Sequence, residues 1–255
     1  MDILLGILIP FFGTTIGSAS VFLLKNKINN RLEKTLLGFS AGIMMAASIW
    51  SLIMPAIEMS NEQNVIAWIP PSIGFLLGIV FLEVTDYMTS RIKTNKLNKK
   101  SELGNRAKLI FAVTLHNIPE GMAVGVIYAS FLSGSNLITL SGALALSVGI
   151  AIQNFPEGAI ISIPLKTSGK SKIKSFILGM LSGIVEPIAA LFTIMLTKYI
   201  IPILPYLLAF AAGAMIHVVV EELIPEAHDG EKNNLCIIGL SIGFVVMMIL
   251  DVALG

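Results

Sequence analysis

The chain contains 255 residues, of which 55% are hydrophobic and only 13% are charged, and its mean hydropathy is +0.85. Soluble globular domains carry about 25% charged residues, so this composition excludes that class and favours a protein embedded in a membrane. The net charge of +1 gives no indication of a nucleic-acid partner, and the single cysteine excludes an intrachain disulfide.

Long apolar runs divide the chain into eight expected membrane-spanning helices joined by short connections. A helix needs about 20 apolar residues to cross a hydrocarbon core ~30 Å thick, and each run is long enough. The sequence therefore predicts an all-α integral membrane protein that forms a single transmembrane domain over residues 1–255. The expected spans are 3–24, 35–57, 67–88, 108–132, 137–164, 174–198, 203–224 and 235–254.

The flanks of the first run distinguish it from a cleavable signal peptide. Only the acidic Asp2 precedes it, whereas a signal peptide begins with basic residues. Lys25, Lys27 and Arg31 follow it in place of the small residues of a cleavage site. We therefore expect this run to be retained as the first span.

The basic residues predict how the chain is oriented in the membrane. Of the 17 Lys and Arg residues, all except Lys198 lie on one side, in the loops after the odd-numbered spans. By the positive-inside rule these loops, including the basic loop 89–107, are cytoplasmic. Both termini are then extracytoplasmic, as an even number of spans requires.

One hexapeptide occurs twice inside the apolar runs. Residues 116–121 read His-Asn-Ile-Pro-Glu-Gly, and residues 153–158 read Gln-Asn-Phe-Pro-Glu-Gly. Each copy lies near the middle of its span, and the two spans run in opposite directions. Ionisable side chains are costly in lipid, and a helix-interior proline leaves a carbonyl without its donor. The duplication therefore predicts an inverted-topology repeat that builds a polar site near the membrane midplane.

The two copies supply side chains that can ligate a metal. His116 and Glu120 are four residues apart and share a helix face, as do Gln153 and Glu157. With the carbonyls freed by the prolines, these groups form a mixed nitrogen and oxygen set that suits Zn²⁺ and other divalent first-row ions. A single polar residue is often only a hydrogen-bonding contact between helices, but buried carboxylates are rarely retained without a partner.

Further candidate residues lie in other spans. Glu186 lies near the middle of the sixth span, directly before Pro187. Glu221 and Glu222 lie toward the cytoplasmic end of the seventh span and Asp86 toward that of the third. Glu221 and Glu222 lie where a cation leaving the site is expected to pause, whereas for Asp86 ordinary solvation of a helix end is an equally good explanation.

Two methionines and a glycine pair each allow more than one interpretation. Met44 and Met45 in the second span are explained by adaptable core packing or by thioether ligation of a metal. Gly239 and Gly243 have the spacing that is typical of close helix packing, within the subunit or between subunits.

Together these motifs resemble those of the ZIP (Zrt/Irt-like) family of divalent metal transporters, especially its prokaryotic, GufA-like branch. The resemblance also includes Phe-Ser-Ala-Gly-Ile-Met-Met-Ala-Ala-Ser at 39–48, Ser-Gly-Ile-Val-Glu-Pro at 182–187, and the run from 217 to 228. Eight spans with both termini outside are likewise similar to the family, so the resemblance covers essentially the whole chain.

The resemblance implies a role for particular residues. Those that match the family's main transport site are His116, Glu120, Gln153 and Glu157, with Met44 or Met45 as an additional ligand. Those that match a neighbouring second metal position are Asn117, Asn154 and Glu186, with Glu120 and Glu157 bridging the two ions. Those that match the cytoplasmic exit route are Glu221, Glu222 and Asp86.

This chain departs from the family pattern in three places. Gln153 stands where many members have His, and Asn154 stands where some have Asp. Residues 89–108 contain no His, although many members carry a His-rich loop there. The sequence therefore gives no support for a metal-sensing cytoplasmic loop, and it leaves the occupancy of the second position open.

We expect a multi-pass transporter in the plasma or inner membrane that imports Zn²⁺ into the cytosol, with Cd²⁺, Fe²⁺ and Mn²⁺ as further substrates. It is not expected to be an enzyme, since no His-Glu-x-x-His element is present. A proton- or sodium-coupled carrier of an organic solute, an intramembrane metalloenzyme and a non-transporting scaffold are the alternatives. The expected partners are divalent ions and the lipid bilayer, with a homodimer left open.

Overall fold

The computed structural model describes most of the chain, in seven segments. These are residues 2–23, 29–96, 102–134, 138–167, 169–197, 201–228 and 234–254. For some helical positions only the backbone is described. Those positions are residues 2, 86, 88–96, 102–113, 115, 116, 197 and 201.

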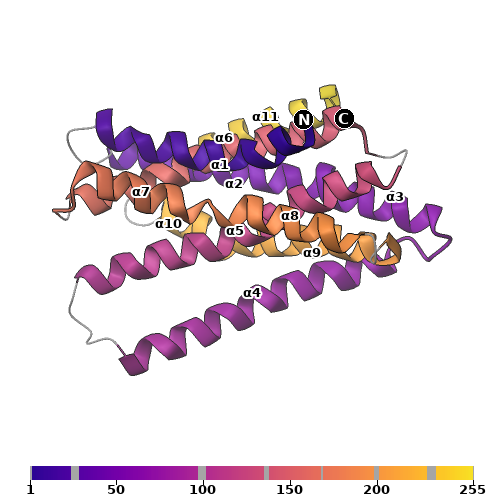
Figure 1. Ribbon diagram of the computed structural model, residues 1–255, viewed down its shortest axis with the longest axis horizontal. Helices are drawn as coiled ribbons and strands as arrows, with labels where there is room; N and C mark the ends of the chain where they lie inside the picture. The colour runs from indigo at the N-terminus through magenta and orange to yellow at the C-terminus, as the bar shows by residue number, and fades with distance from the viewer. Residues whose placement is uncertain are drawn as a thin grey trace.

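Within the described residues the chain forms eight helical rods packed into one bundle (Figure 1). The uninterrupted rods are α1 (Asp2–Leu23), α4 (Ile69–Lys96), α5 (Glu102–Leu132), α6 (Leu140–Thr167) and α11 (Leu235–Leu254). Three rods are interrupted. The first consists of α2 (Asn30–Ala47), η1 (Ser48–Ile53) and α3 (Met54–Glu62), and the second of α7 (Lys172–Ser182) and α8 (Val185–Thr197). The third follows η2 (Ile201–Ile203) and consists of α9 (Leu204–Val218), η3 (Val219–Leu223) and α10 (Ile224–His228).

Six of the described rods are long and apolar enough to cross a membrane, and α4 adds a shorter apolar stretch over Ile69–Thr85. The prediction of an all-helical protein is thereby confirmed, and the long apolar rods are consistent with a helical membrane protein. Both termini lie at one end of the bundle, whereas α4 ends and α5 begins at the other end (Figure 1). Helical backbone continues into residues 89–96 and 102–107, which the sequence assigns to the basic loop.

The rods pack as four parallel pairs: α1 with α6, α5 with α8, α2 with α11, and α4 with α9. Glycines bring the partners of each pair close together. A Cβ on Gly239 would collide with the carbonyl oxygen of Thr35, and one on Gly243 with that of Phe39. The prediction that Gly239 and Gly243 mark close helix packing is therefore confirmed, and the contact is between α11 and α2.

Two rods contain a π-helical segment at corresponding places. In one rod η1 ends two residues before Pro55, and in the other η3 ends two residues before Pro225. A proline cannot donate a backbone hydrogen bond and its ring crowds the carbonyl four residues earlier. The wider π turn makes room for the ring, so both rods continue through the proline instead of breaking.

The sixth expected span is divided into two helices. α7 ends at Ser182, a turn at Gly183 and Ile184 follows, and α8 begins at Val185. Pro187 lies in the first turn of α8, where a missing N–H is tolerated because it has no partner within the helix. The break places Glu186 in the first turn of a new helix inside the bundle.

Candidate metal site

The two copies of the hexapeptide meet in the interior of the bundle, where α5 packs against α6. Glu120 and Gln153 are both fully buried. The side-chain amide of Gln153 donates from Nε2 to Oε1 of Glu120 at 2.6 Å. One copy thus supplies a carboxylate and the other an amide to a direct contact between the two helices.

Glu186 joins this contact region from α8. Its Oε1 accepts one hydrogen bond from Nδ2 of Asn117 at 3.1 Å and another from Oγ1 of Thr14 at 3.0 Å. The same Asn117 amide donates to the carbonyl oxygen of Ser182 at 3.1 Å, at the end of α7. Three helices, α1, α5 and α8, therefore meet at the carboxylate of Glu186, a residue that is only 1% exposed, and Asn117 links this contact to the end of α7.

Three carboxylates share this small volume. Glu157 is 9% exposed and is close enough to Glu120 and Glu186 to repel both electrostatically. The side chain of Asn154 lies beside the same two carboxylates. Neighbouring carboxylates repel one another, and a cation between them relieves that repulsion. The site is therefore arranged to attract positive charge.

Oxygen atoms that accept no hydrogen bond accumulate at the same place. Among the described residues, the buried side-chain oxygens without a partner include Asn117 Oδ1, Glu120 Oε2, Gln153 Oε1, Asn154 Oδ1 and Glu186 Oε2. Leaving one buried polar group unsatisfied costs about 1–3 kcal/mol. Five acceptors in one region form a surplus that a bound cation would relieve. In this article these five residues together with Glu157 are called the buried cluster.

The buried cluster differs from a conventional metal centre. Among the side chains that the structure describes, no three His, Cys, Asp or Glu groups form an arrangement that could hold a metal ion. Amide NH₂ groups of Gln153 and Asn117 instead occupy one oxygen each of Glu120 and Glu186. Rotating an amide by half a turn exchanges the positions of its NH₂ group and its oxygen. Each amide would then present an oxygen that can ligate a cation in place of a hydrogen-bond donor.

The helix break adds to the electrostatics of the cluster. Glu186 lies in the first turn of α8, where the aligned peptide dipoles of the helix give the helix end a partial positive charge. This charge stabilises an ionised carboxylate, and it is little screened because Glu186 is buried. The break therefore offsets part of the cost of placing a carboxylate in the bundle interior.

The structure does not describe every residue that the sequence singles out. The side chains of His116 and Asp86 lie outside the described part of the chain, so their roles stay predictions. Met44 is fully buried on α2. One turn earlier, Ser40 donates to the carbonyl oxygen of Gln153 at 3.1 Å, so α2 passes directly beside the cluster.

Two of the candidate residues in the seventh span lie in its π-helical segment. Glu221 is exposed and Glu222 is half-buried in η3, which packs against α2. His217 is buried one turn earlier, and the exposed His228 has its Nδ1 3.1 Å from the carbonyl oxygen of Ile224. The helix that follows η3, α10, lies toward the end of the bundle away from the termini (Figure 1), and the exit route stays a prediction.

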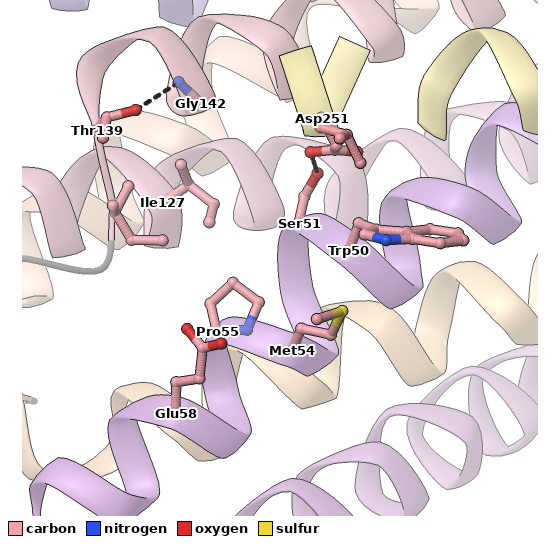
Figure 2. A pocket seen from close by; sticks show the side chains of 11 residues that line it. Trp50, Ser51, Met54, Pro55, Glu58, Ile127, Thr139, Gly142 and Asp251 are labelled. Atoms are coloured by element: carbon pink, nitrogen blue, oxygen red, sulfur yellow. Dashed lines mark hydrogen bonds between the residues drawn. The ribbon is translucent and has the colours of Figure 1, made fainter. Parts of the chain in front are cut away.

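Sequence reasoning missed a cavity of about 190 Å³ near the end of the bundle where the termini lie. Figure 2 shows Glu58 and Asp251 approaching it from opposite sides, with Ser51 donating to Asp251. The lining residue Ile127 is seven residues beyond Glu120 on α5, about 10 Å along the helix. Isolated acidic residues near span ends gave no pattern by which the cavity could be found.

Sequence reasoning also missed Thr14. It is a single hydroxyl in an apolar run, and such residues are common in membrane helices as local hydrogen-bond donors. Only the structure shows that its hydroxyl reaches across to Glu186 on α8.

Comparison with known proteins places the chain in a family. The family model described as ZIP Zinc transporter matches residues 106–251, more than half of the chain. Zinc transporter ZIP11 of Xenopus tropicalis is 36% identical, over 99% of this chain and 97% of that protein. Zinc transporter GufA of Myxococcus xanthus is 34% identical, over 95% of this chain and 96% of that protein. Zinc transporter ZupT of Chlorobaculum parvum is 32% identical, over 95% of this chain and 93% of that protein. The chain therefore belongs to the ZIP zinc transporter family.

Proposed function

We propose that this chain carries divalent metal cations, with Zn²⁺ as the preferred ion, across the membrane into the cytosol through the buried cluster. The observation that carries the proposal is the surplus of oxygen acceptors around three carboxylates in the interior of a helical membrane bundle. Three relatives are named zinc transporters, which supports zinc as the cargo. As a member of this family the chain is a transporter rather than an enzyme.

The proposed topology has eight spans, an inverted repeat and both termini outside. The four parallel helix pairs support it, because they fall into two matching sets: α1 with α6 corresponds to α8 with α5, and α2 with α11 corresponds to α9 with α4. Matching positions of the π-helical segments in the second and seventh rods point the same way. Two halves related in this way are typical of secondary transporters.

The proposed site has two neighbouring cation positions. The first uses Glu120, Gln153 and Glu157, with His116 and Met44 completing the ligand set. The second uses the remaining members of the cluster, which are Asn117, Asn154 and Glu186. Glu120 and Glu157 bridge the two positions, which is supported by the electrostatic contact of Glu157 with Glu120 and Glu186. Oxygen and nitrogen donors of this kind also accept Cd²⁺, Fe²⁺ and Mn²⁺, and among the first-row ions the affinity follows the Irving–Williams order.

The proposed path begins at the cavity beside Glu58 and Asp251. Two carboxylates near the extracytoplasmic end concentrate cations there, and the cavity lies about two helical turns from the cluster along α5. At the cluster the cation displaces protons, because His116 must be neutral and the glutamates ionised to act as ligands. Release toward the cytosol then follows the side of the bundle that carries Glu221, Glu222 and Asp86.

Uptake of radioactive zinc into proteoliposomes tests the proposal, with Cd²⁺ and Mn²⁺ as competitors. Glu120→Gln removes one charge from the cluster with almost no change in shape, so uptake should fall at least tenfold. Glu62→Gln is the matched control, since Glu62 is exposed at the end of α3 and its loss should leave uptake unchanged. Equal uptake by both variants would exclude the buried cluster as the transport site.

A further inference from the structure

We propose that Thr14 is a positioning residue of the second cation position, because it holds the Glu186 carboxylate and is the counterpart of Glu186 in the first half of the repeat. This inference rests on the proposed transport function and goes beyond it. It assigns a role on α1, from which the sequence predicts no site residue. In this arrangement one half of the repeat supplies the carboxylate and the other supplies the hydroxyl that directs it.

The hydrogen bonds at Glu186 define what Thr14 does. Thr14 is fully buried, and its hydroxyl donates to Oε1 of Glu186 at 3.0 Å. Asn117 donates to the same oxygen at 3.1 Å. Two donors therefore bind Oε1. The other carboxylate oxygen, Oε2, is buried, has no hydrogen-bond partner among the described residues, and is the oxygen left to accept a cation. Thr14 thereby fixes which oxygen is presented to a cation.

The neighbouring Thr15 shows that a threonine hydroxyl on α1 need not bond to another helix. Its hydroxyl donates to the carbonyl oxygen of Phe11 at 2.8 Å, one turn earlier in the same helix. This local bond is the usual arrangement for threonine in a helix. The Thr14 hydroxyl instead crosses to another helix, where its acceptor is a member of the buried cluster.

Glycine packing identifies Thr14 and Glu186 as counterparts. The glycine that ends the first hexapeptide, Gly121, packs against the backbone of Glu186: a Cβ there would collide with the carbonyl oxygen of Glu186. The glycine that ends the second hexapeptide, Gly158, makes the same contact with the carbonyl oxygen of Thr14. The repeat therefore places Thr14 on α1 where it places Glu186 on α8.

The chemistry explains why the two counterparts differ. A second carboxylate at position 14 would lie directly against Glu186 and would repel it. A threonine hydroxyl donates to that carboxylate instead, which favours its ionised form. The helix break completes the arrangement, since a Cβ on Gly183 would lie 2.8 Å from both Cβ and Oγ1 of Thr14. The glycine in the break thus leaves the space in which the two side chains meet.

A group that orients a metal ligand without touching the metal typically affects metal affinity by 10–100-fold. Thr14→Val keeps the shape of the side chain and removes the hydroxyl. We expect its zinc dissociation constant, measured by equilibrium binding to the purified protein, and its KM for zinc uptake to rise about tenfold. The maximal uptake rate should change much less than KM, because the primary ligands remain. Thr14→Ser keeps the donor and should stay within about twofold of the native protein.

Thr15→Val is the matched control, because it deletes a hydroxyl one residue away that bonds only within α1. Its zinc affinity should equal that of the native chain. Thr14→Ala provides a second hydroxyl deletion in case the valine variant does not fold. In a Glu186→Ala background the effect of Thr14→Val on zinc binding should vanish, since its acceptor is gone.

The results separate this inference from the proposed function. Zinc affinity that is unchanged by hydroxyl deletion at position 14, or reduced equally by Thr14→Ser, overturns the role of Thr14. A persistent effect of Thr14→Val in the Glu186→Ala background also overturns it. If Glu120→Gln leaves uptake intact, the proposed function fails first, and that failure is visible without any Thr14 variant.

Discussion

Substituting Gly158 by alanine probes the close contact between α1 and α6 beside the buried cluster. The added Cβ would lie 2.8 Å from the backbone nitrogen of Ser18 and 2.9 Å from its Oγ, and it would collide with the carbonyl oxygen of Thr14. Two of these three atoms belong to the backbone, so no side-chain rotation relieves the clash. The two helices must separate, and Glu157, which directly precedes the glycine, moves with α6.

The expected loss of stability follows from three contributions. Overpacking costs about 1–3 kcal/mol. The hydrogen bond from Ser18 Oγ to the Gly158 carbonyl, 3.3 Å long, is worth about 0.5–1.5 kcal/mol and weakens as the helices separate. The better helix propensity of alanine returns about 1 kcal/mol. The free energy of unfolding should therefore fall by about 2 kcal/mol, which lowers Tm by about 4–8 °C for a chain of this size.

Gly149→Ala is the matched control on the same helix. Its Cβ would meet only the side chain of Met247, including Cε at 2.8 Å. The end of a methionine side chain can turn away at small cost, so this variant should keep its native Tm or gain slightly. Thermal unfolding in detergent, followed by circular dichroism, compares the two variants. Equal Tm values for them would refute the claim that Gly158 is required by the backbone of α1.

Three further outcomes test other parts of the account. Gln153→His introduces an imidazole and should lower the KM for Zn²⁺ several-fold more than the KM for Mn²⁺, as competition uptake assays would show. Acidifying the outside medium should raise the KM for zinc with little change in maximal rate, because protons and metal compete for the same ligands; a fall in maximal rate alone would contradict this. Asp251→Asn should slow uptake at low ionic strength and lose its effect at high salt, since steering by the cavity is electrostatic. An Asp251→Asn effect that is independent of salt would argue against such steering.

Local pattern was sufficient to predict that the two hexapeptides form one polar region. Buried carboxylates and prolines in apolar helices are costly, so their repetition indicated a shared role. The structure brings Glu120 and Gln153 into direct contact, together with Asn117 and Glu186. The close packing at Gly239 followed from spacing alone in the same way.

Features that depend on long-range contacts could not be predicted from the sequence. Thr14 and Glu186 meet beside the break at Gly183, and that contact joins residues 172 positions apart. The π-helical segments before Pro55 and Pro225 depend on packing that lets a rod continue through a proline.

The most direct test of the central claim is equilibrium zinc binding to the purified protein in detergent, comparing variants of the buried cluster with variants outside it. A double variant, Glu120→Gln with Glu157→Gln, should lose high-affinity binding because it removes both bridging carboxylates. Asp251→Asn and Glu62→Gln should bind zinc as the native chain does, since the first affects only access and the second is remote and exposed. High-affinity zinc binding that survives in the double variant but is lost in Asp251→Asn would contradict the account and would move the binding site to the extracytoplasmic cavity.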